Sequence, residues 1–379
     1  MNNLNALGTL LITFLSIVAI AVKLLSAADN SWSVAGFLSE GAPPLGFEYA
    51  IEPRPFEFPK DHSSHPKFRS EWWYFTGNVN SETGSSFGFQ LTLFRFAFRP
   101  QATKSNSPWR RSNVYLGHFA ISDFTSGVFH NFERQGRPAL GLAGVRDKPP
   151  RIWIRDWSIE LIEAEMGIWQ LKAQEAGVVL DVKANSRRPI TVQGDQGLSK
   201  KSEAPGNASF YYSIPRLAIA GSITTPTGNH QVYGNAWFDH EWSTSALADG
   251  QLGWDWFSLQ LSDGRDIMFY QIRDRAGRTE AVSHGMLLTK QGVQTALRPE
   301  HVQITVTQYW QSPTSNARYP AAWQIRIPTH GISIRVLPRM SEQEWNQSFV
   351  YWEGAVVVTG ESATEPISGT GYVELVGYN

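Results

Sequence analysis

Hydrophobic and polar residues alternate along much of this chain with the two-residue period of β-strands. From Phe87 to Leu93, aromatic and aliphatic residues alternate with glycine, glutamine and threonine, which predicts a half-buried strand with one apolar and one polar face. The same alternation recurs at Leu180–Ala184, Val302–Val306, Trp323–Ile327 and Ile332–Val336. Residues 328–331, Pro-Thr-His-Gly, join the last two segments and predict a short hairpin connection.

Helical signals are few in comparison. Ser341 followed three residues later by Glu344 has the form of a capping box and predicts one or two helical turns. Many strands separated by turn residues otherwise predict an all-β fold, either a sandwich or a barrel. Closure into antiparallel barrels is favoured because it removes exposed sheet edges.

A weak internal repeat indicates two such barrels. Residues 234–239, Gly-Asn-Ala-Trp-Phe-Asp, are similar to residues 369–374, Gly-Thr-Gly-Tyr-Val-Glu, and each copy would close one barrel. The aromatic segments 71–74 and 253–257 would each open one, although chance similarity of short aromatic strands is the alternative. We therefore expect an N-terminal barrel over residues 60–247 and a C-terminal barrel over residues 248–379, after a proline-rich extended lead-in over residues 29–59.

The N-terminus carries an apolar run from Ala6 to Val22, followed by Lys23 and the small residues 26–28, Ser-Ala-Ala. This pattern predicts that residues 1–28 are an export signal cleaved after about Ala28, or an uncleaved membrane anchor through residues 6–22. In both cases the rest of the chain would be exported, to the periplasm or the extracellular space.

Composition narrows the function classes. The 379 residues contain no cysteine, which excludes disulfides, thiol nucleophiles and zinc–cysteine sites. The 33 basic and 34 acidic residues leave a net charge of -1 without a basic block, so we expect no nucleic-acid partner. The 15 Trp, 12 Tyr and 21 Phe residues suit strands and an apolar ligand pocket.

The densest group of ionisable residues is Asp239, His240 and Glu241, followed by Trp242, at the end of a predicted strand. On a strand His240 would face opposite to the two carboxylates. One interpretation is a general acid or base at a barrel mouth, and the other is a polar latch where two barrels meet. The second repeat copy retains only Glu374, so we expect the polar chemistry to be confined to the first barrel.

A second polar group comprises Asp61, His62 and His65, followed by Glu71. Two histidines three residues apart could bind zinc together with His240, or they could belong to a capped turn that leads into the first strand. No third ligand at helical spacing accompanies them, so we predict no metal and no cofactor. Residues 84–88, Gly-Ser-Ser-Phe-Gly, match a nucleophile-elbow pattern but run directly into a strand, and we interpret them as a hairpin turn.

Several of the segments described above, together with further aromatic segments, occur in the order that is typical of one family. They are Asp61-His62 with His65, Glu71–Asn78, Gly88–Leu91, His118–Ile121, Gly234–Trp237, Asp239–Trp242, Gly253–Trp256 and Tyr351–Gly354. From about Phe56 to the C-terminus, the chain resembles the AttH-like family, whose members are often labelled predicted secreted hydrolases and which is related to carotenoid 1,2-hydratases. The resemblance implies a tandem lipocalin-like fold, a hydrophobic ligand and export machinery similar to lipoprotein-releasing ABC transporters.

The hydratase relationship can be compared with particular residues. The hydratase-like pattern of a histidine and a tryptophan two apart is present as His240 and Trp242, with Tyr270 on the next strands. The carboxylate expected two residues beyond that tyrosine is replaced by Ile272, so Asp239, Glu241 or Asp255 would have to substitute for it.

Two functions therefore stay open. The first is an exported carrier that binds a lipid, polyene or terpenoid and is associated with an ABC transporter; the isoleucine at position 272 favours it. The second is an enzyme, either a hydratase or isomerase or a secreted hydrolase, which would need His240 or a carboxyl group in the ligand cavity. The predicted catalytic residues are Asp239, His240, Glu241 and Trp242. The predicted ligand-binding residues are His62, His65, Glu71, Trp72, Tyr74, Trp237, Trp254, Trp256 and Tyr270.

Overall fold

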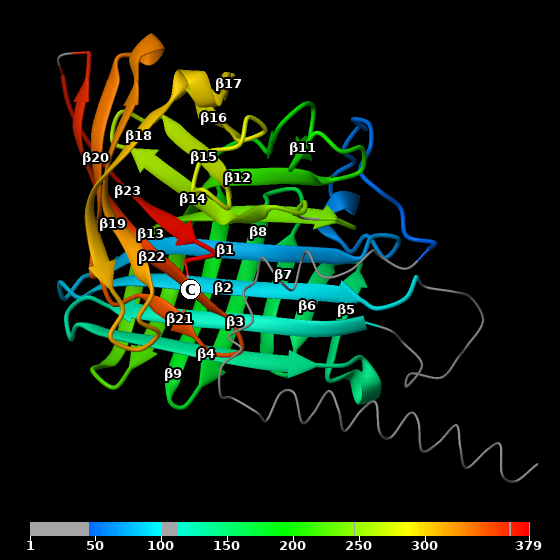
Figure 1. The fold of residues 1–379 in the computed structure, drawn as a ribbon. Coiled ribbons are helices and arrows are strands. Elements are labelled where there is room, and N and C mark those ends of the chain that lie inside the picture. Colours follow the sequence, from blue (N-terminus) through cyan, green and yellow to red (C-terminus); the bar gives the residue numbers. More distant parts are fainter. Residues whose placement is uncertain (1–44, 101–112, 246, 364, 379) are drawn as a thin grey trace, which may run out of the picture. The chain divides into compact units, whose positions relative to one another are not determined.

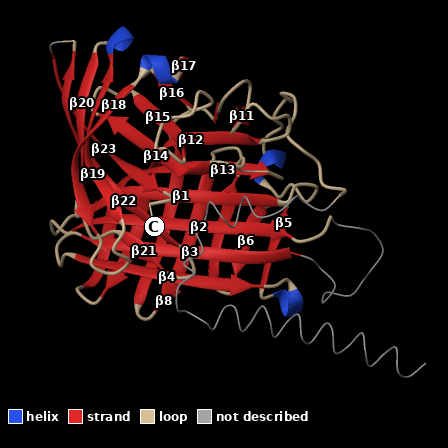
Figure 2. Ribbon diagram, in the orientation of Figure 1, coloured by secondary structure: helices blue, strands red, loops and turns tan. Residues whose placement is uncertain are grey.

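The alternating segments form two antiparallel sheets that follow one another along the chain (Figures 1 and 2). A computed structural model of the chain describes residues 45–100, 113–245, 247–363 and 365–378. Helices in these residues are short 3-10 turns: η1 (Lys60–His62), η3 (Ala139–Gly141), η4 (Pro299–His301) and η5 (Pro328–His330). Over the same ranges, no helix has both the length and the apolar character needed to cross a membrane. The predicted export signal or anchor lies outside the described residues.

The first sheet has 13 strands and curls over on itself. Its strands are β1 (Ser70–Ser81), β2 (Ser86–Ala97), β3 (Asn113–Asp123), β4 (Val128–Gly136), β5 (Ala143–Asp147), β6 (Pro150–Ile154), β7 (Trp157–Glu163), β8 (Ile168–Glu175), β9 (Val178–Ser186), β10 (Thr191–Val192), β11 (Leu198–Lys200), β12 (Ala208–Thr225) and β13 (Gly228–Ser243). The order is β4-β3-β2-β1-β13-β12-β9-β8-β7-β6-β5, with β10 and β11 paired to β12. Figure 1 shows β1 to β4 crossing in front of β5 to β9.

The inner faces of this sheet meet in one core of aromatic and branched aliphatic side chains. In the described residues the two ends of the strand path, β4 and β5, are not joined by a hydrogen-bonded ladder. Arg134 on β4 instead forms ion pairs with Asp156 and Glu175 on the opposite side of the gap. The barrel is therefore closed there by side chains.

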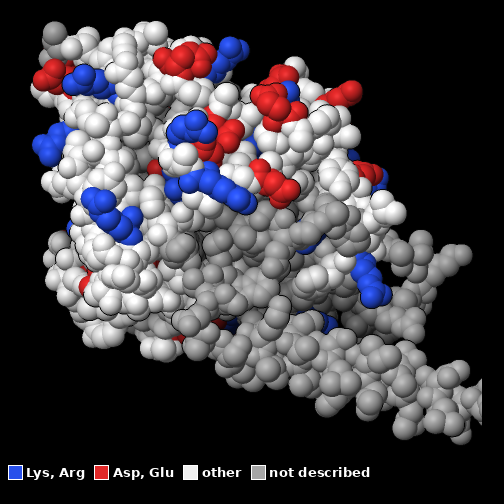
Figure 3. Space-filling model, in the orientation of Figure 1, with Lys and Arg blue, Asp and Glu red and all other residues white. Residues whose placement is uncertain are grey.

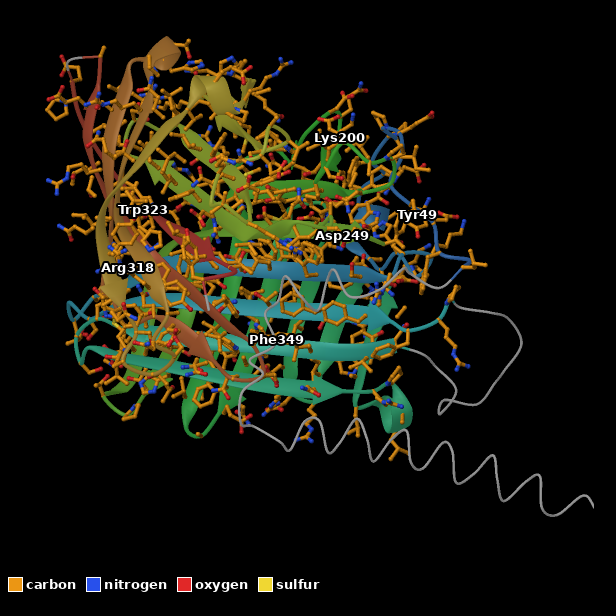
Figure 4. The ribbon with its side chains drawn as sticks, viewed as in Figure 1. Tyr49, Lys200, Asp249, Arg318, Trp323 and Phe349 are labelled. Atoms are coloured by element: carbon orange, nitrogen blue, oxygen red, sulfur yellow. The ribbon has the colours of Figure 1, made fainter. Side chains whose placement is uncertain are left out.

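The second sheet has 10 strands in the order β17-β16-β15-β14-β23-β22-β20-β19-β18, with β21 paired to β22. Its strands are β14 (Gln251–Leu261), β15 (Asp266–Asp274), β16 (His284–Leu288), β17 (Gln294–Leu297), β18 (Gln303–Gln311), β19 (Arg318–Ile327), β20 (Ile332–Pro338), β21 (Glu344–Asn346), β22 (Val350–Ser362) and β23 (Glu365–Leu375). Trp323 on β19, labelled in Figure 4, is 0% exposed in the separate core of this sheet. The predicted all-β fold of two lipocalin-like units is confirmed.

The two copies of the sequence repeat occupy equivalent places. β13 pairs with β1 and β12, whereas β23 pairs with β14 and β22. Asp239 lies opposite Tyr74 in the first ladder, and Glu374 lies opposite Trp256 in the second. The chain passes from one sheet to the other between Ser243 and Gln251, through the connection that contains Asp249 (Figure 4).

The strand predicted over Phe87–Leu93 forms part of β2, but the expectation that one of its faces is wetted is wrong. Its polar residues Gln90 and Thr92 are 2% and 0% exposed. The second sheet covers this face so closely that a Cβ atom at Gly88 would lie 2.8 Å from the Tyr372 hydroxyl. Sequence alternation shows which residues share a face, but it does not show that a second sheet buries the polar one.

The other segments predicted as strands fall within β9, β18, β19 and β20, except for Val302, which precedes β18, and η5 forms the predicted hairpin connection. The helical turns expected at Ser341–Glu344 are wrong, because Glu344 begins β21. The Glu344 carboxylate accepts hydrogen bonds from Ser312 and Ser315. It is thus engaged by a distant loop and cannot cap a helix at Ser341.

Candidate active site

The site is built from the alternation along β13. Asp239 and Glu241 face the second sheet, whereas His240 and Trp242 point into the core of the first. The expectation that His240 faces opposite to the two carboxylates is therefore confirmed. This alternation separates the predicted catalytic residues into two environments.

A partly enclosed pocket lies between the two sheets. Its cavity volume is about 100 Å³. Its residues come from the facing strands of both sheets and from the connections beside them: Trp72, Tyr74, Gln90, Phe94, His118, Lys201, Tyr211, Asp239, Glu241, Leu247, Trp254, Trp256, Tyr270, Ile272, Tyr351, Glu353 and Glu374. We call this the inter-sheet pocket. Phe349, labelled in Figure 4, packs beside it against the ring of His118, with ring centroids 6.3 Å apart.

Asp239 is held in the pocket wall by three donors. The Tyr211 hydroxyl donates to Oδ2 at 2.6 Å, while Ser213 and the Trp237 indole donate to Oδ1. Burial nevertheless raises the pKa of Asp239 to about 7, because the three hydrogen bonds offset only part of the loss of hydration. A carboxyl group with this pKa can give or take a proton at neutral pH.

Glu353 on β22 is less completely paired. The Tyr74 hydroxyl donates to its Oε1 at 2.6 Å across the boundary between the sheets. Its Oε2 is buried and has no hydrogen-bond partner among the described residues. Burial raises the pKa of Glu353 well above its ordinary value, and the neighbouring Glu374 raises it further.

Glu374 on β23 lies directly opposite Glu353 in the antiparallel ladder, so both side chains leave the same face. The Trp254 indole donates to Glu374 Oε2 at 3.0 Å. The side chain keeps partial access to solvent at the edge of the pocket. Burial still raises the pKa of Glu374 to about 7, and the nearby Glu241 and Asp239 add to the shift.

Lys201 is the one cation among the described residues that line the pocket. Its ammonium group lies 2.8 Å from Glu241 Oε1 and 4.4 Å from the centre of the Tyr270 ring. Although burial opposes the shift, the carboxylate of Glu241 raises the pKa of Lys201. The pocket therefore combines four carboxyl groups with one lysine that is already paired, which favours a protonated carboxyl at neutral pH. On the face drawn in Figure 3, the surface charges are of both signs and interspersed.

The other face of β13 contributes to a buried network. His240 Nε2 donates to Glu71 Oε1 at 3.0 Å, and His65 Nδ1 donates to the same oxygen at 2.7 Å. Arg95 Nε donates to Glu71 Oε2 at 3.0 Å. Asp61 accepts from His65 Nε2 at 3.1 Å, and the Tyr212 hydroxyl bridges His240 and His62. We call these residues the histidine network.

Burial lowers the pKa of His240, and it lowers that of His62 to about 3, so both are neutral at pH 7. For His65 burial is outweighed by Glu71 and Asp61, which raise its pKa. Glu71 and Asp61 therefore favour the charged form of His65, which joins the segment around η1 to β1. This arrangement places His240 in a buried network inside the first sheet, away from the boundary between the sheets where a latch was expected.

His65, Glu71 and His240 have potential ligand atoms within 4.8 Å of one another. However, the two contacts to Glu71 Oε1 have hydrogen-bond lengths, and an arginine occupies the other carboxylate oxygen. These groups fit a hydrogen-bonded network better than a metal site. The expectation of no metal stays a prediction.

Replacing Glu71 by glutamine is expected to lower the free energy of unfolding by about 3–5 kcal/mol. The substitution would leave Arg95 buried without a counter-charge and would leave His65 paired with Asp61 alone. Urea denaturation at neutral pH measures the change. Glu82→Gln in the exposed β1–β2 turn is the control and should change stability by less than about 0.5 kcal/mol. A loss below about 1 kcal/mol for Glu71→Gln would contradict a structural role for the histidine network.

The structure brings part of the predicted site together and separates the rest. The inter-sheet pocket contains Asp239, Glu241, Trp72, Tyr74, Trp254, Trp256 and Tyr270. Trp237 lies behind Asp239 and positions its carboxylate. The remaining predicted residues lie inside the first sheet, away from this pocket: His240, Trp242, His62, His65 and Glu71.

Several pocket residues were missed from the sequence. Glu353 and Glu374 come from the second sheet, so the expectation that polar chemistry is confined to the first barrel is wrong. Ile272 also lines the pocket, and these two glutamates supply carboxyl groups beside it. Asp255, considered as a substitute, is instead bound by Arg273 and Tyr378 on the opposite face of β14. The internal repeat was the sequence feature that could have identified Glu374, because it aligns Glu374 with Asp239 of the first sheet.

Known proteins share this architecture. Residues 49–378 match the family model described as AttH-like. A solved structure described as AttH from Nitrosomonas europaea is 30% identical, has a TM-score of 0.77, and the likeness covers 88% of this chain and 100% of that one. Kievitone hydratase from Nectria haematococca shares the fold at 14% identity and a TM-score of 0.65, over 88% of this chain and 98% of that one.

Among curated proteins, the dehydratase asqC of Emericella nidulans is 23% identical over 145 residues. The match spans 37% of this chain and 37% of that enzyme. The family match, by contrast, extends over nearly all described residues of both sheets, including the inter-sheet pocket. This chain belongs to the AttH-like family.

Proposed function

We propose that the protein is an acid–base enzyme of the hydratase or dehydratase type, acting on an uncharged, largely apolar ligand in the inter-sheet pocket. Glu353 is the observation that carries the proposal. One of its oxygens accepts from Tyr74, and the other is buried without a hydrogen-bond partner among the described residues. An ionised carboxylate in that place would lack hydration on one oxygen, whereas a carboxylic acid has its own O–H to donate. Glu353 therefore suits the role of general acid.

A base for the same reaction lies on the neighbouring strand. Glu374 faces Glu353 across the β22–β23 ladder, and two carboxylates so close favour sharing one proton. With a pKa of about 7, Glu374 can accept a proton at neutral pH. Asp239, on the opposite wall, has a similar pKa and is the alternative base.

The reaction can be written with these two groups. In dehydration, Glu353 gives its proton to a hydroxyl group of the ligand, and the C–O bond breaks to release water. Glu374 takes a proton from the adjacent carbon, whose electron pair forms the C=C bond. In hydration the same steps run in reverse: Glu374 returns its proton to the carbon, and Glu353 takes a proton from the water that adds to the C=C bond.

The walls of the pocket limit the ligand. Trp72, Trp254 and Trp256 offer aromatic faces that suit an unsaturated or ring-containing ligand and that stabilise a developing cation. Lys201 is already paired with Glu241, so an anionic ligand would meet uncompensated carboxylates. The sequence match to a dehydratase supports this class of reaction.

The experiment is a screen of hydroxylated and unsaturated terpenoids, polyenes and phenolic compounds with the purified protein. Mass spectrometry would detect the gain or loss of one water, and heavy-oxygen water would label a hydration product. Turnover by the wild-type protein that is lost in Glu353→Gln supports the proposal. Ligands that are retained but returned unchanged by both proteins would contradict catalysis and support the carrier predicted from the sequence.

Export, an ABC-transporter partner and binding without turnover remain predictions of the sequence. Native mass spectrometry of protein purified from its own host would identify a ligand that co-purifies. A lipid carried without chemical change would be the carrier result.

A further inference from the structure

A second cavity lies at one end of the first sheet, where β2 and β3 approach β5 and β6. Its volume is about 190 Å³, roughly ten times what a single buried water requires. Its described lining shares no residue with the inter-sheet pocket. It is lined by polar groups such as Arg95 and Asn113 and by the apolar side chains of Val145 and Trp153. It is therefore a separate place where a small molecule could bind.

Arg95 presents an unused donor at this cavity. Its Nε donates to Glu71, and its Nη2 donates to the carbonyl oxygens of His65 and Phe68, all at 3.0 Å. Its Nη1 is buried and has no hydrogen-bond partner among the described residues, and the residue is 1% exposed. Three hydrogen bonds fix the guanidinium plane, so Nη1 is oriented before any ligand arrives. A buried N–H group without a partner is unfavourable and indicates a missing acceptor.

Asn113 presents an unused acceptor at the same cavity. Its Oδ1 is buried without a partner among the described residues, and the residue is 6% exposed. In the β2–β3 ladder Arg95 is opposite Tyr115 and Asn113 is opposite Ala97. The backbone positions of Arg95 and Asn113 are thus diagonal neighbours on one face, about 7–8 Å apart. Because both residues line the cavity, one small molecule with two polar ends can contact both.

The local charge favours an anion. Arg54 and Arg95 carry permanent positive charge, and Asp61 and Glu71 bind them directly. His65 lies between the same two carboxylates, in contact with both. When His65 is protonated, these five groups sum to one positive charge. A single carboxylate on Arg95 Nη1 would neutralise it.

We propose that this cavity binds a small hydroxy carboxylate, with its carboxylate on Arg95 Nη1 and its hydroxyl donating to Asn113 Oδ1. The side chains of Val145 and Trp153 enclose the carbon part of the ligand. The binding is independent of the reaction proposed for the inter-sheet pocket, since the two cavities lie on opposite faces of β2.

Isothermal titration calorimetry with three isosteric probes tests the proposal on the full chain. Lactate offers both groups, propionate lacks the hydroxyl, and lactamide lacks the charge. We expect saturable binding of lactate, binding of propionate weaker by about fivefold, and no saturable binding of lactamide. The ionic strength is kept constant with chloride.

Matched variants assign the contacts. Asn113→Leu should abolish the difference between lactate and propionate and retain carboxylate binding, whereas Asn346→Leu, an exposed asparagine on β21, should change neither. Arg95→Gln should abolish binding. Because Arg95 also supports the fold, Val145→Phe, which fills the cavity from β5, provides a second test and should also abolish binding.

The absence of saturation by lactate at concentrations on the order of 0.1 M would overturn the proposal and leave ordered water as the occupant of the cavity. Binding that is unchanged in Val145→Phe would place the anion elsewhere. A lactate preference that persists in Asn113→Leu would refute the role of Asn113. None of these results depends on activity in the inter-sheet pocket.

Discussion

Replacing Glu353 by glutamine is expected to lower kcat for water addition or removal by about two to four orders of magnitude. The amide keeps the shape of the side chain and can still accept from Tyr74, but it has no acidic proton to give in dehydration and cannot take one from water in hydration. Because burial keeps the Glu353 carboxyl protonated in the resting protein, the substitution removes no buried charge, and the folded protein should be as stable at neutral pH. Steady-state rates on the ligand found in the screen, together with urea denaturation, measure both effects.

Glu361→Gln is the matched control, because Glu361 lies on the same strand but is exposed. It should retain wild-type kcat. A Glu353→Gln protein that folds and keeps more than about a tenth of the wild-type kcat would contradict the assignment of Glu353 as general acid. Loss of activity in both variants would instead indicate that the fold around β22 is disturbed.

Replacing Glu374 by glutamine is expected to raise the free energy of unfolding relative to the wild-type protein, and to do so by more at high pH than at low pH. In the folded protein the pKa of Glu374 is raised from 4.5 to about 7, so the folded state holds a proton that the unfolded chain has already lost. Wild-type stability therefore falls as the pH rises from about 4.5 to about 7, whereas the glutamine variant cannot ionise. For a fully buried group, each unit by which the pKa is raised would change the free energy of unfolding by about 1.4 kcal/mol. With partial exposure we expect a total of about 1–3 kcal/mol.

Urea denaturation at intervals between about pH 5 and about pH 8 gives the difference in unfolding free energy between variant and wild type. Subtracting the wild-type value removes the contribution of the buried histidines and leaves that of Glu374. Their lowered pKa values add stability as the pH rises toward 6.5, but they do so equally in both proteins. Glu361→Gln should show no such trend. A difference that is constant with pH, or that shrinks as the pH rises, would mean that Glu374 is ionised throughout.

The period of two along the chain predicted the all-β class, whereas the pair of lipocalin-like units was predicted from the repeat and the family resemblance. The period identifies segments of β2, β9, β19 and β20, and the repeat indicates the equivalent roles of β13 and β23. The helix expected at Ser341 failed because a local capping pattern cannot reveal that Ser312 and Ser315, about 30 residues earlier, bind Glu344. Tertiary contacts outweigh local propensity at that point.

The candidate site was harder to predict, for a physical reason. Strand alternation correctly separates Asp239 and Glu241 from His240, but it does not say which face meets the ligand cavity. That depends on the second sheet, which covers the outer face of the first and contributes Glu353 and Glu374. Because Tyr74 and Glu353 are 279 positions apart, nothing local in the sequence indicates their contact.

Infrared difference spectroscopy of carboxyl groups at neutral pH tests the central claim most directly, because it needs no substrate. The wild-type protein should show the C=O band of a protonated carboxylic acid, and the band should shift when the protein is transferred to heavy water. The account predicts that the band loses the share of one carboxyl in Glu353→Gln and keeps it in Glu361→Gln, while Asp239 and Glu374, with pKa values of about 7, supply the rest of the band. A wild-type spectrum without a protonated carboxyl at neutral pH, or a band unchanged in Glu353→Gln, would contradict it.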